Sequence, residues 1–274
     1  MNTNCKKSIL REKTVSIVKE ASNLMKNRNF WVKNKGNTGN DVTAMDVAVQ
    51  EYLKEHLLTA FPDSVFMGEE EEFSWNEKRV QETEWLWIVD PIDGTSNFIR
   101  DLHASAISVG LLHKGSPWLG VVYNPYLNEM FEAEKGCGAF LNDQPIRVSD
   151  RDFSHSHFCT AASLYNKALA KPCFSIMEEV YGQCDDFRRF GTAAIELSSL
   201  AAGRTELYFE MRLFPWDYAA SILLIQEAGG YVGTLPSLPS LVYDRPIPII
   251  AANTEDNFHK LNEIISRHIP QLPY

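Results

Sequence analysis

Two aspartates separated by two residues form the strongest chemical signal in the chain. Asp90 and Asp93 follow an apolar run rich in Trp, Ile and Val, and Gly94 and Thr95 come directly after them. The run predicts a buried strand that ends at the two acids, with Pro91 and Gly94 placing both carboxylates on one short bend. Carboxylates placed in this way are suited to binding Mg²⁺. Proteins bind this ion through a few acids, and substrate phosphate and water complete its coordination shell.

The side chains after Gly94 predict the start of a helix beside these acids. Thr95, Ser96 and Asn97 are residue types that cap helices, and the free N–H groups of a helix N-terminus attract anions. A cation site would then lie next to an anion site. This combination is typical of metal-assisted phosphate chemistry.

Glu69 repeats the pattern of an acid at the end of a strand. It follows the apolar segment 64–67 and Gly68, which predict a short strand and a turn. Two neighbouring strands that both end in acids would bring Glu69 and Asp90 together. The acids at 70–72 form a run that is more typical of a solvated loop.

Asp46, Glu210 and Asp217 also stand at the ends of predicted elements. Asp46 lies in the first turn of a helix predicted over 43–61, and Asp217 in the first turn of a helix predicted over 215–227. Glu210 closes a short predicted strand. For Asp46 and Asp217, a helix-capping role explains the residue type as well as a chemical role does.

The elements that must position these acids divide into two predicted halves. Residues 1–149 form an α+β half that ends in an antiparallel meander, and residues 150–274 form a half of alternating strands and helices, with a polar connector at 150–156. The other predicted elements are a helix in the first ~30 residues, a polar loop over 33–40, a short helix around 75–80, strands over 106–112, 119–123, 129–133, 138–141 and 246–251, a helix over 192–202, and a C-terminal helix that ends near Pro270.

Composition indicates a globular protein. Of the 274 residues, 45% are hydrophobic and 23% are charged, which allows a large core. The net charge of −10 argues against a nucleic-acid partner held by charge alone. Since we find neither a signal-peptide pattern nor an apolar run that could span a membrane, we expect a cytoplasmic protein. The five cysteines lack a Cys-x-x-Cys pair, so we expect reduced thiols.

With these acids assembled, the sequence resembles the inositol monophosphatase family of Mg²⁺-dependent, lithium-sensitive phosphatases. The block Asp-Pro-Ile-Asp-Gly-Thr at 90–95 is highly specific when both partner blocks occur in order. The matching blocks are 68–70, 87–98 and 216–220, with supporting matches at 41–46, 191–194 and 227–230.

The resemblance implies a layered αβαβα fold of the α+β class with mixed sheets, commonly a homodimer, with Mg²⁺ at the junction of the two halves. It assigns Glu69, Asp90 and the Ile92 carbonyl to one Mg²⁺, and Asp90, Asp93 and Asp217 to a second. A third, weaker Mg²⁺ near Glu69 is described for the family. We therefore expect two or three ions per site.

The resemblance also implies roles in binding and catalysis. Gly94 and Thr95 would hold the phosphate, and Asp46 and Thr95 would orient and deprotonate the attacking water, with Glu69 counted among the catalytic residues. Ala193 and Glu210 would contact substrate hydroxyls, and Asp93 and Asp217 would belong to the substrate site as well as to the metal site. Five acids in one cleft repel one another unless cations bind them, and two metal ions stabilise both the attacking and the leaving oxygen. We expect no covalent intermediate.

Three departures from the family pattern leave the substrate open. Asn40 stands where the family often has Asp, His103-Ala104 replace a Pro-aromatic pair, and Phe214 replaces a polar residue near the substrate. The first hypothesis is a phosphomonoesterase for a small phosphorylated polyol, with inositol monophosphate as the nominal substrate. The alternatives are a fructose-1,6-bisphosphatase, an NADP phosphatase or a 3′-phosphoadenosine 5′-phosphate phosphatase, and, in another class, a protein-binding regulator that retains the fold.

Overall fold

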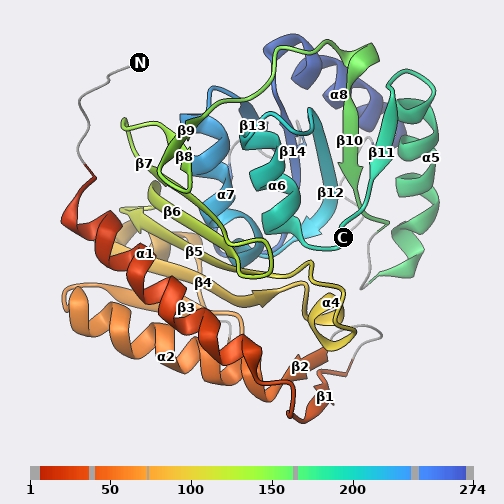
Figure 1. The fold of residues 1–274 in the computed structure, drawn as a ribbon. Helices are drawn as coiled ribbons and strands as arrows, with labels where there is room; N and C mark the ends of the chain where they lie inside the picture. The colour runs from red at the N-terminus through yellow and green to blue at the C-terminus, as the bar shows by residue number, and fades with distance from the viewer. Residues whose placement is uncertain (1–6, 37–40, 73, 163–165, 236–240, 270–274) are drawn as a thin grey trace.

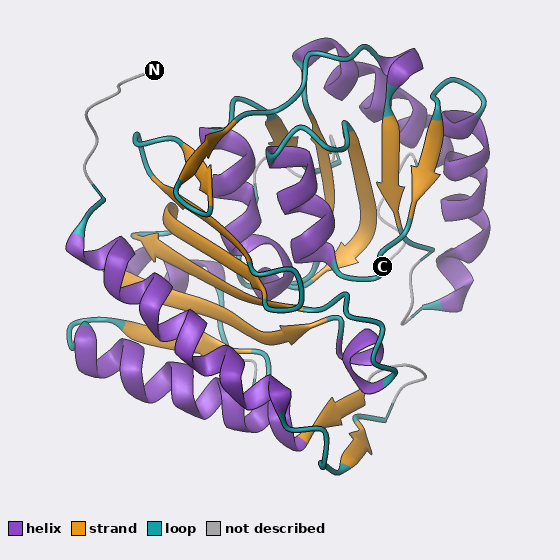
Figure 2. Cartoon of the chain, in the orientation of Figure 1, coloured by secondary structure: helices purple, strands orange, loops and turns teal. Residues whose placement is uncertain are grey.

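The elements of the chain form five layers, in the order helices, sheet, helices, sheet, helices (Figure 1; Figure 2). The computed structural model describes residues 7–36, 41–72, 74–162, 166–235 and 241–269. The expected αβαβα fold of the α+β class, with mixed sheets, is confirmed. Among the described residues, no helix combines the length and the apolar character needed to cross a bilayer.

The first sheet has seven strands in the order β3-β4-β5-β6-β7-β8-β9, and α1 and α2 cover one of its faces (Figure 1). β3 runs parallel to β4, and every later neighbour is antiparallel, so the predicted meander is confirmed. The elements are α1 (Ile9–Ala21), a 3₁₀ turn (Ser22–Lys26), α2 (Ala44–Ala60), β3 (Val65–Gly68), α3 (Glu77–Glu82), β4 (Trp85–Asp93), α4 (Thr95–Ile99), β5 (Ala106–His113), β6 (Ser116–Asn124), β7 (Glu129–Glu134), β8 (Ala139–Leu141) and β9 (Gln144–Ile146).

The second sheet has five strands in the order β11-β10-β12-β14-β13, and α5 and α8 lie on its outer side (Figure 1). β10 is parallel to both β11 and β12, whereas β14 is antiparallel to β12 and β13. The elements are two 3₁₀ turns (Phe153–His155 and Lys167–Leu169), β10 (His157–Thr160), α5 (Ala170–Tyr181), β11 (Asp186–Arg188), α6 (Ala193–Ala201), β12 (Leu207–Leu213), α7 (Pro215–Glu227), β13 (Tyr231–Gly233), β14 (Ile247–Ala252) and α8 (Glu255–His268). The division into halves after residue 149 stays a prediction.

α6 and α7 fill the layer between the two sheets, and α7 lies directly against β5 and β6. Two glycines permit this close approach. A Cβ atom on Gly120 would lie 2.3 Å from the carbonyl oxygen of Ala220, and one on Gly110 would lie 2.9 Å from the Ala219 Cβ atom. The depth at which α7 packs, and therefore the place of its first turn, depends on these two glycines.

We expect Gly120→Ala to lower the free energy of unfolding by about 1–3 kcal/mol, because the backbone of α7 must move to admit the methyl group. Urea denaturation measures this loss. Gly182→Ala is the matched control, since its Cβ atom would meet nothing closer than 3.6 Å. Equal stabilities of the two variants would contradict the claim that Gly120 sets the position of α7.

The predicted bend at the two aspartates is wrong, because β4 continues through Asp90 to Asp93. Asp90 lies opposite Ser108 and Asp93 lies opposite Ala106, so β4 carries one extra residue over this interval. Such a bulge interrupts the ladder of hydrogen bonds, and this is where a strand can accommodate Pro91. The bulge, and not the end of the strand, presents the two carboxylates.

The predicted side-chain cap after Gly94 is also wrong. Gly94 is itself the N-cap of α4, with φ of 83°, and no side chain caps this helix. A left-handed glycine turns the chain sharply enough to begin the helix, so the Thr95 hydroxyl is left to make other contacts.

Other differences arise where the sequence pattern was short or interrupted. β1 (Val32–Asn34) pairs with β2 (Asp41–Thr43), so part of the predicted polar loop is a strand, and 37–40 lie outside the described residues. β12 runs past Glu210 to Leu213, so Glu210 does not close the strand.

Cys137 is disulfide-bonded, which corrects the expectation of reduced thiols at that position. β9, β10, α5, β11 and β13 were not predicted, and four of them have only three or four residues.

Candidate functional site

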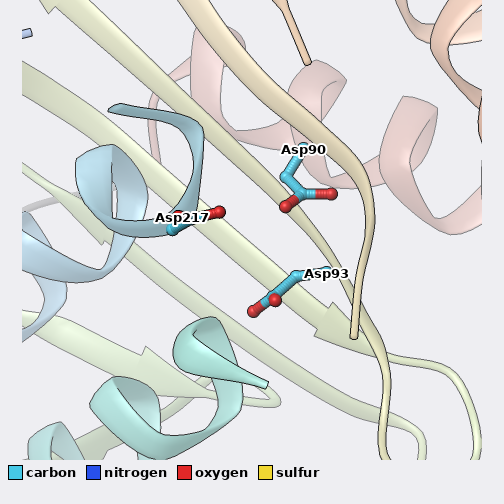
Figure 3. A group of neighbouring side chains, drawn as sticks. All are labelled: Asp90, Asp93 and Asp217. Atoms are coloured by element: carbon cyan, nitrogen blue, oxygen red, sulfur yellow. The ribbon is translucent and has the colours of Figure 1, made fainter. Parts of the chain in front are cut away.

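Three carboxylates that are far apart in the sequence meet between the two sheets. Asp90 and Asp93 come from the bulge of β4, and Asp217 comes from the first turn of α7 (Figure 3). One oxygen atom of each lies within 4.8 Å of those of the other two. An all-oxygen set of this kind suits Mg²⁺, so the residues present fit the expected metal.

Each of the three carboxylates is oriented by a backbone N–H group. Asp90 Oδ1 accepts a hydrogen bond from the N–H of Ile92 at 3.0 Å. Asp93 Oδ2 accepts one from the N–H of Ala194 at 2.6 Å, and Asp217 Oδ2 accepts one from the N–H of Phe214 at 2.7 Å. Since a carboxylate has several lone pairs, each acid keeps acceptor capacity for a cation.

The electrostatics of the three acids favour a bound cation. Burial, followed by repulsion from neighbouring acids, raises the pKa of Asp90 and of Asp217 well above the ordinary range. Burial also raises the pKa of Asp93 to about 8, although the hydrogen bond from Ala194 opposes the shift. The negative charge of this cluster is therefore unfavourable without a cation, and a divalent ion would relieve it.

Glu69 lies at the end of β3 and lines the same pocket, but it is not a member of the three-acid cluster. Its N–H group donates to the carbonyl of Val89 in the neighbouring strand at 3.1 Å, which confirms that the two strands bring their acids together. Its Oε1 atom lies 3.0 Å from Lys35 Nζ, which also contacts Glu70 at 2.6 Å. Burial lowers the pKa of Lys35, but the two glutamates outweigh it and hold the pKa above its ordinary value.

Asp46 caps a helix and also contacts Thr95. It completes a capping box at the start of α2, where Oδ2 accepts from the N–H of Thr43 at 2.7 Å. Its other oxygen, Oδ1, accepts from the Thr95 hydroxyl at 3.2 Å, and that hydroxyl also lies 3.1 Å from the Ile92 carbonyl. Burial raises the pKa of Asp46 to about 6. The carboxylate is thus a cap that also reaches the turn beside the metal cluster.

The turn at Gly94 is closely packed. A Cβ atom there would lie 2.4 Å from the Thr192 hydroxyl oxygen and 3.1 Å from the Ala104 carbonyl. Asn97 Nδ2 joins the two sides of this contact, because it donates to the carbonyls of Ala104 and Phe190 at 2.8 and 2.7 Å. The start of α4 is therefore fixed against the start of α6.

The pocket brings together nearly all of the predicted site residues in a cavity of about 300 Å³. Asp46 is the exception, since it is buried behind Thr95. The predicted residues that line the cavity are Glu69, Asp90, Ile92, Asp93, Gly94, Thr95, Ala193, Glu210 and Asp217. Their individual roles stay predictions.

Several residues of the pocket were missed from the sequence. Lys35 stood in a segment that was predicted to be a loop, and Arg189 and Arg212 carried no motif. Glu196 is buried on α6, where Oε1 accepts from the N–H groups of Phe190 and Gly191 at 2.6 and 2.9 Å. An acid in a helix of otherwise small and apolar residues is the signal that could have identified Glu196.

The sequence of the chain is similar to proteins of one known family. The model of the inositol monophosphatase family matches residues 3–269. Nus factor SuhB of Escherichia coli (strain K12) is 38% identical over 193 residues, which are 70% of this chain and 70% of that protein.

Several solved structures with more than 25% identity share this fold. The extragenic suppressor protein SuhB from Bartonella henselae has a TM-score of 0.86 and 32% identity, over 96% of this chain and 100% of that one. SaIMPase-II with inositol monophosphate bound has a TM-score of 0.79 and 26% identity, over 95% of both chains.

Proposed function

Because the chain belongs to the inositol monophosphatase family, we propose that it is a Mg²⁺-dependent phosphomonoesterase that hydrolyses a small phosphorylated polyol, with inositol monophosphate as the reference substrate. The observation that carries the proposal is the cluster of Asp90, Asp93 and Asp217 beside the Gly94 turn. Support also comes from SaIMPase-II, a relative in fold and sequence whose structure contains inositol monophosphate.

In this proposal, Asp90, Asp93, Asp217 and Glu69, with the Ile92 carbonyl, hold two or three Mg²⁺ ions. When bound, Mg²⁺ supplies a Lewis acid for the phosphate and lowers the pKa of water. The backbone bend at Gly94 and the first N–H groups of α4 hold the phosphate oxygens.

The Asp46–Thr95 pair orients the attacking water and accepts its proton. The Thr95 hydroxyl can donate to the Asp46 carboxylate, with which it already forms a hydrogen bond, while its own oxygen accepts from the water. The raised pKa of Asp46, about 6, suits a general base that works near neutral pH. Because water attacks directly, no side chain of the protein becomes phosphorylated.

Across the pocket, Glu210 and Ala193 face the leaving alcohol. Glu210 Oε2 accepts a hydrogen bond from the Tyr208 hydroxyl at 3.0 Å, which fixes the carboxylate, and its remaining acceptors are available to substrate hydroxyls. This wall decides which alcohol fits, since specificity follows from the pairing of polar pocket groups.

Asp46→Asn separates the capping role from the catalytic role. An asparagine oxygen can still accept from the Thr43 N–H, so we expect the free energy of unfolding to change by less than about 1 kcal/mol. We expect kcat to fall by about a hundredfold, because the amide cannot accept the proton. Chemical denaturation measures the free energy of unfolding, and steady-state kinetics measure kcat. An unchanged kcat would assign Asp46 to capping alone.

A substrate panel tests the proposed function. The panel contains inositol 1-phosphate, fructose 1,6-bisphosphate, NADP and 3′-phosphoadenosine 5′-phosphate, compared by kcat/KM with Mg²⁺ and with EDTA. The proposal expects phosphate release that requires Mg²⁺ and is inhibited by Li⁺. Undiminished turnover in EDTA would contradict it.

A protein-binding regulator is the second candidate, and the name Nus factor carried by the SuhB relatives favours it. The complete set of pocket acids favours an enzyme, with or without a second role. Absence of turnover across the panel, together with tight binding of a protein partner, would favour the regulator. We also propose that the protein is a cytoplasmic homodimer, as family membership suggests, and sedimentation analysis tests the dimer.

A further inference from the structure

Two arginines stand on the wall of the same acid-lined pocket. Arg189 is exposed and Arg212 is half-buried, and both line the cavity together with Glu210. Within the described part of the chain, neither guanidinium forms a hydrogen bond or a contact ion pair with another residue, although Arg189 is close enough to Glu210 and Glu196 to oppose the rise in the pKa of both carboxyls. By contrast, the neighbouring Arg188 pairs with Asp186. The pocket therefore offers two cationic groups that are available to a ligand.

Arg212 lines the cavity from β12, together with Glu210 and Leu213 of the same strand and Phe214 directly after it. Met211 is buried in the core instead. The pairing of β12 with β14 is irregular between Glu210 and Leu213, so a strict two-residue alternation does not hold over this interval. Arg212 thus lines the same pocket as the glutamate that is proposed to contact the leaving alcohol.

An aromatic stack supports the guanidinium of Arg212. The ring of Phe214 lies parallel to that of Trp216, with 4.9 Å between the centroids and 2° between the planes. The Arg212 Cζ atom lies 5.0 Å from the centroid of the Phe214 ring. A cation–π contact of this kind limits the conformations of the guanidinium and so lowers the entropy cost of binding through it.

The turn after Arg189 is fixed from the other side. The N–H groups of Phe190 and Gly191 both donate to the buried carboxylate of Glu196. The Asn97 amide holds the Phe190 carbonyl at 2.7 Å. The backbone that carries Arg189 is therefore tied both to α6 and to the start of α4, although the side chain itself is exposed.

We propose that Arg189 and Arg212 bind a second phosphate group, carried by the leaving alcohol, while the Gly94 turn and the three aspartates take the phosphate that is hydrolysed. Guanidinium groups match phosphate through paired N–H donors, and two of them can balance a doubly charged group. The inference rests on the proposed phosphatase function and deepens it. The preferred substrates are then polyols or nucleosides with two phosphates.

Matched pairs of substrates test the second phosphate. One pair is fructose 1,6-bisphosphate and fructose 1-phosphate, and the other is 3′-phosphoadenosine 5′-phosphate and 3′-AMP. The wild-type protein is expected to show a kcat/KM at least about tenfold higher for the bisphosphate of one pair, the size of effect given by one charged hydrogen bond. A preference confined to the first pair identifies a sugar, and one confined to the second identifies a nucleotide.

Arg189→Gln and Arg212→Gln are each expected to raise KM for the preferred bisphosphate by about tenfold, with kcat and the monophosphate kinetics unchanged. Arg188→Gln is the control, since Arg188 does not line the pocket. The inference is overturned if the wild-type protein has equal kcat/KM for the two members of both pairs. It is also overturned if the variants lose equal activity on both members of a pair. In either case, Mg²⁺-dependent phosphate release leaves the proposed function standing. Absence of release from every substrate overturns both.

Discussion

Asp90→Asn is expected to reduce Mg²⁺-dependent phosphate release by at least about a thousandfold. The carboxylate is buried, is placed by the β4 bulge, and meets Asp93 and Asp217 within 4.8 Å. A metal ion contributes several kcal/mol of charge stabilisation in the transition state, and each 1.36 kcal/mol is a factor of about ten in rate. Steady-state phosphate release at saturating substrate, with Mg²⁺ varied, measures the loss.

The same variant should fold at least as well as the wild type without metal. The asparagine removes one charge from a buried, repulsive cluster, so we expect the metal-free protein to resist urea equally or better. Asp63→Asn is the control for the substitution itself, because Asp63 is exposed and does not line the pocket. Retained activity in Asp90→Asn would contradict a metal site built on this carboxylate.

Without Mg²⁺, the stability of the protein is expected to fall as the pH rises from about 4 to about 8. The pKa of Asp93 is raised from 3.8 to about 8, so over this interval the folded state holds a proton that the unfolded state has released. This stabilisation is fully present below the unfolded pKa and is lost as the pH rises through the folded pKa, by up to about 1.4 kcal/mol per pH unit for each proton. Asp90 and Asp217 are shifted in the same direction.

Mg²⁺ is expected to reverse this trend. An ion that binds only the folded protein stabilises it by about 2.7 kcal/mol at a hundred times its Kd, and it binds more tightly as the acids lose their protons. Thermal unfolding in EDTA and in excess Mg²⁺, at pH 5 and pH 8, measures both effects. The rise in Tm with Mg²⁺ should be larger at pH 8, and a rise that is equal at both values would argue against binding by the buried acids. Asp93→Asn should weaken the pH dependence in EDTA.

The long elements followed from sequence patterns and the layered fold from the family resemblance, whereas the short elements followed from neither. The stripe of α2 and the strands of the meander repeat over enough residues to show their period, and both were predicted correctly. β11 and β13 have three residues each, which is too few for a period, and their places depend on neighbouring strands. The β4 bulge was misread as a strand end because Pro91 also suits a turn.

Residue types and spacing predicted the acids of the site, but only the family resemblance implied that Asp217 joins Asp90 and Asp93. Each of Asp46 and Asp217 has a complete explanation as a helix cap, and the structure shows both capping contacts. Only the packing of α7 against β5 and β6 brings Asp217 to the β4 acids. Arg189 and Arg212 carried no motif, since their significance arises from lining the same pocket.

Diffraction from crystals soaked in Mn²⁺ tests whether Asp90, Asp93 and Asp217 bind the catalytic metal, because Mn²⁺ can replace Mg²⁺ among oxygen ligands and scatters anomalously. We expect an anomalous peak bounded by Asp90, Asp93 and Asp217, which is lost in Asp90→Asn crystals together with phosphate release. A protein that releases phosphate with Mn²⁺ but shows no peak among these three carboxylates would contradict it.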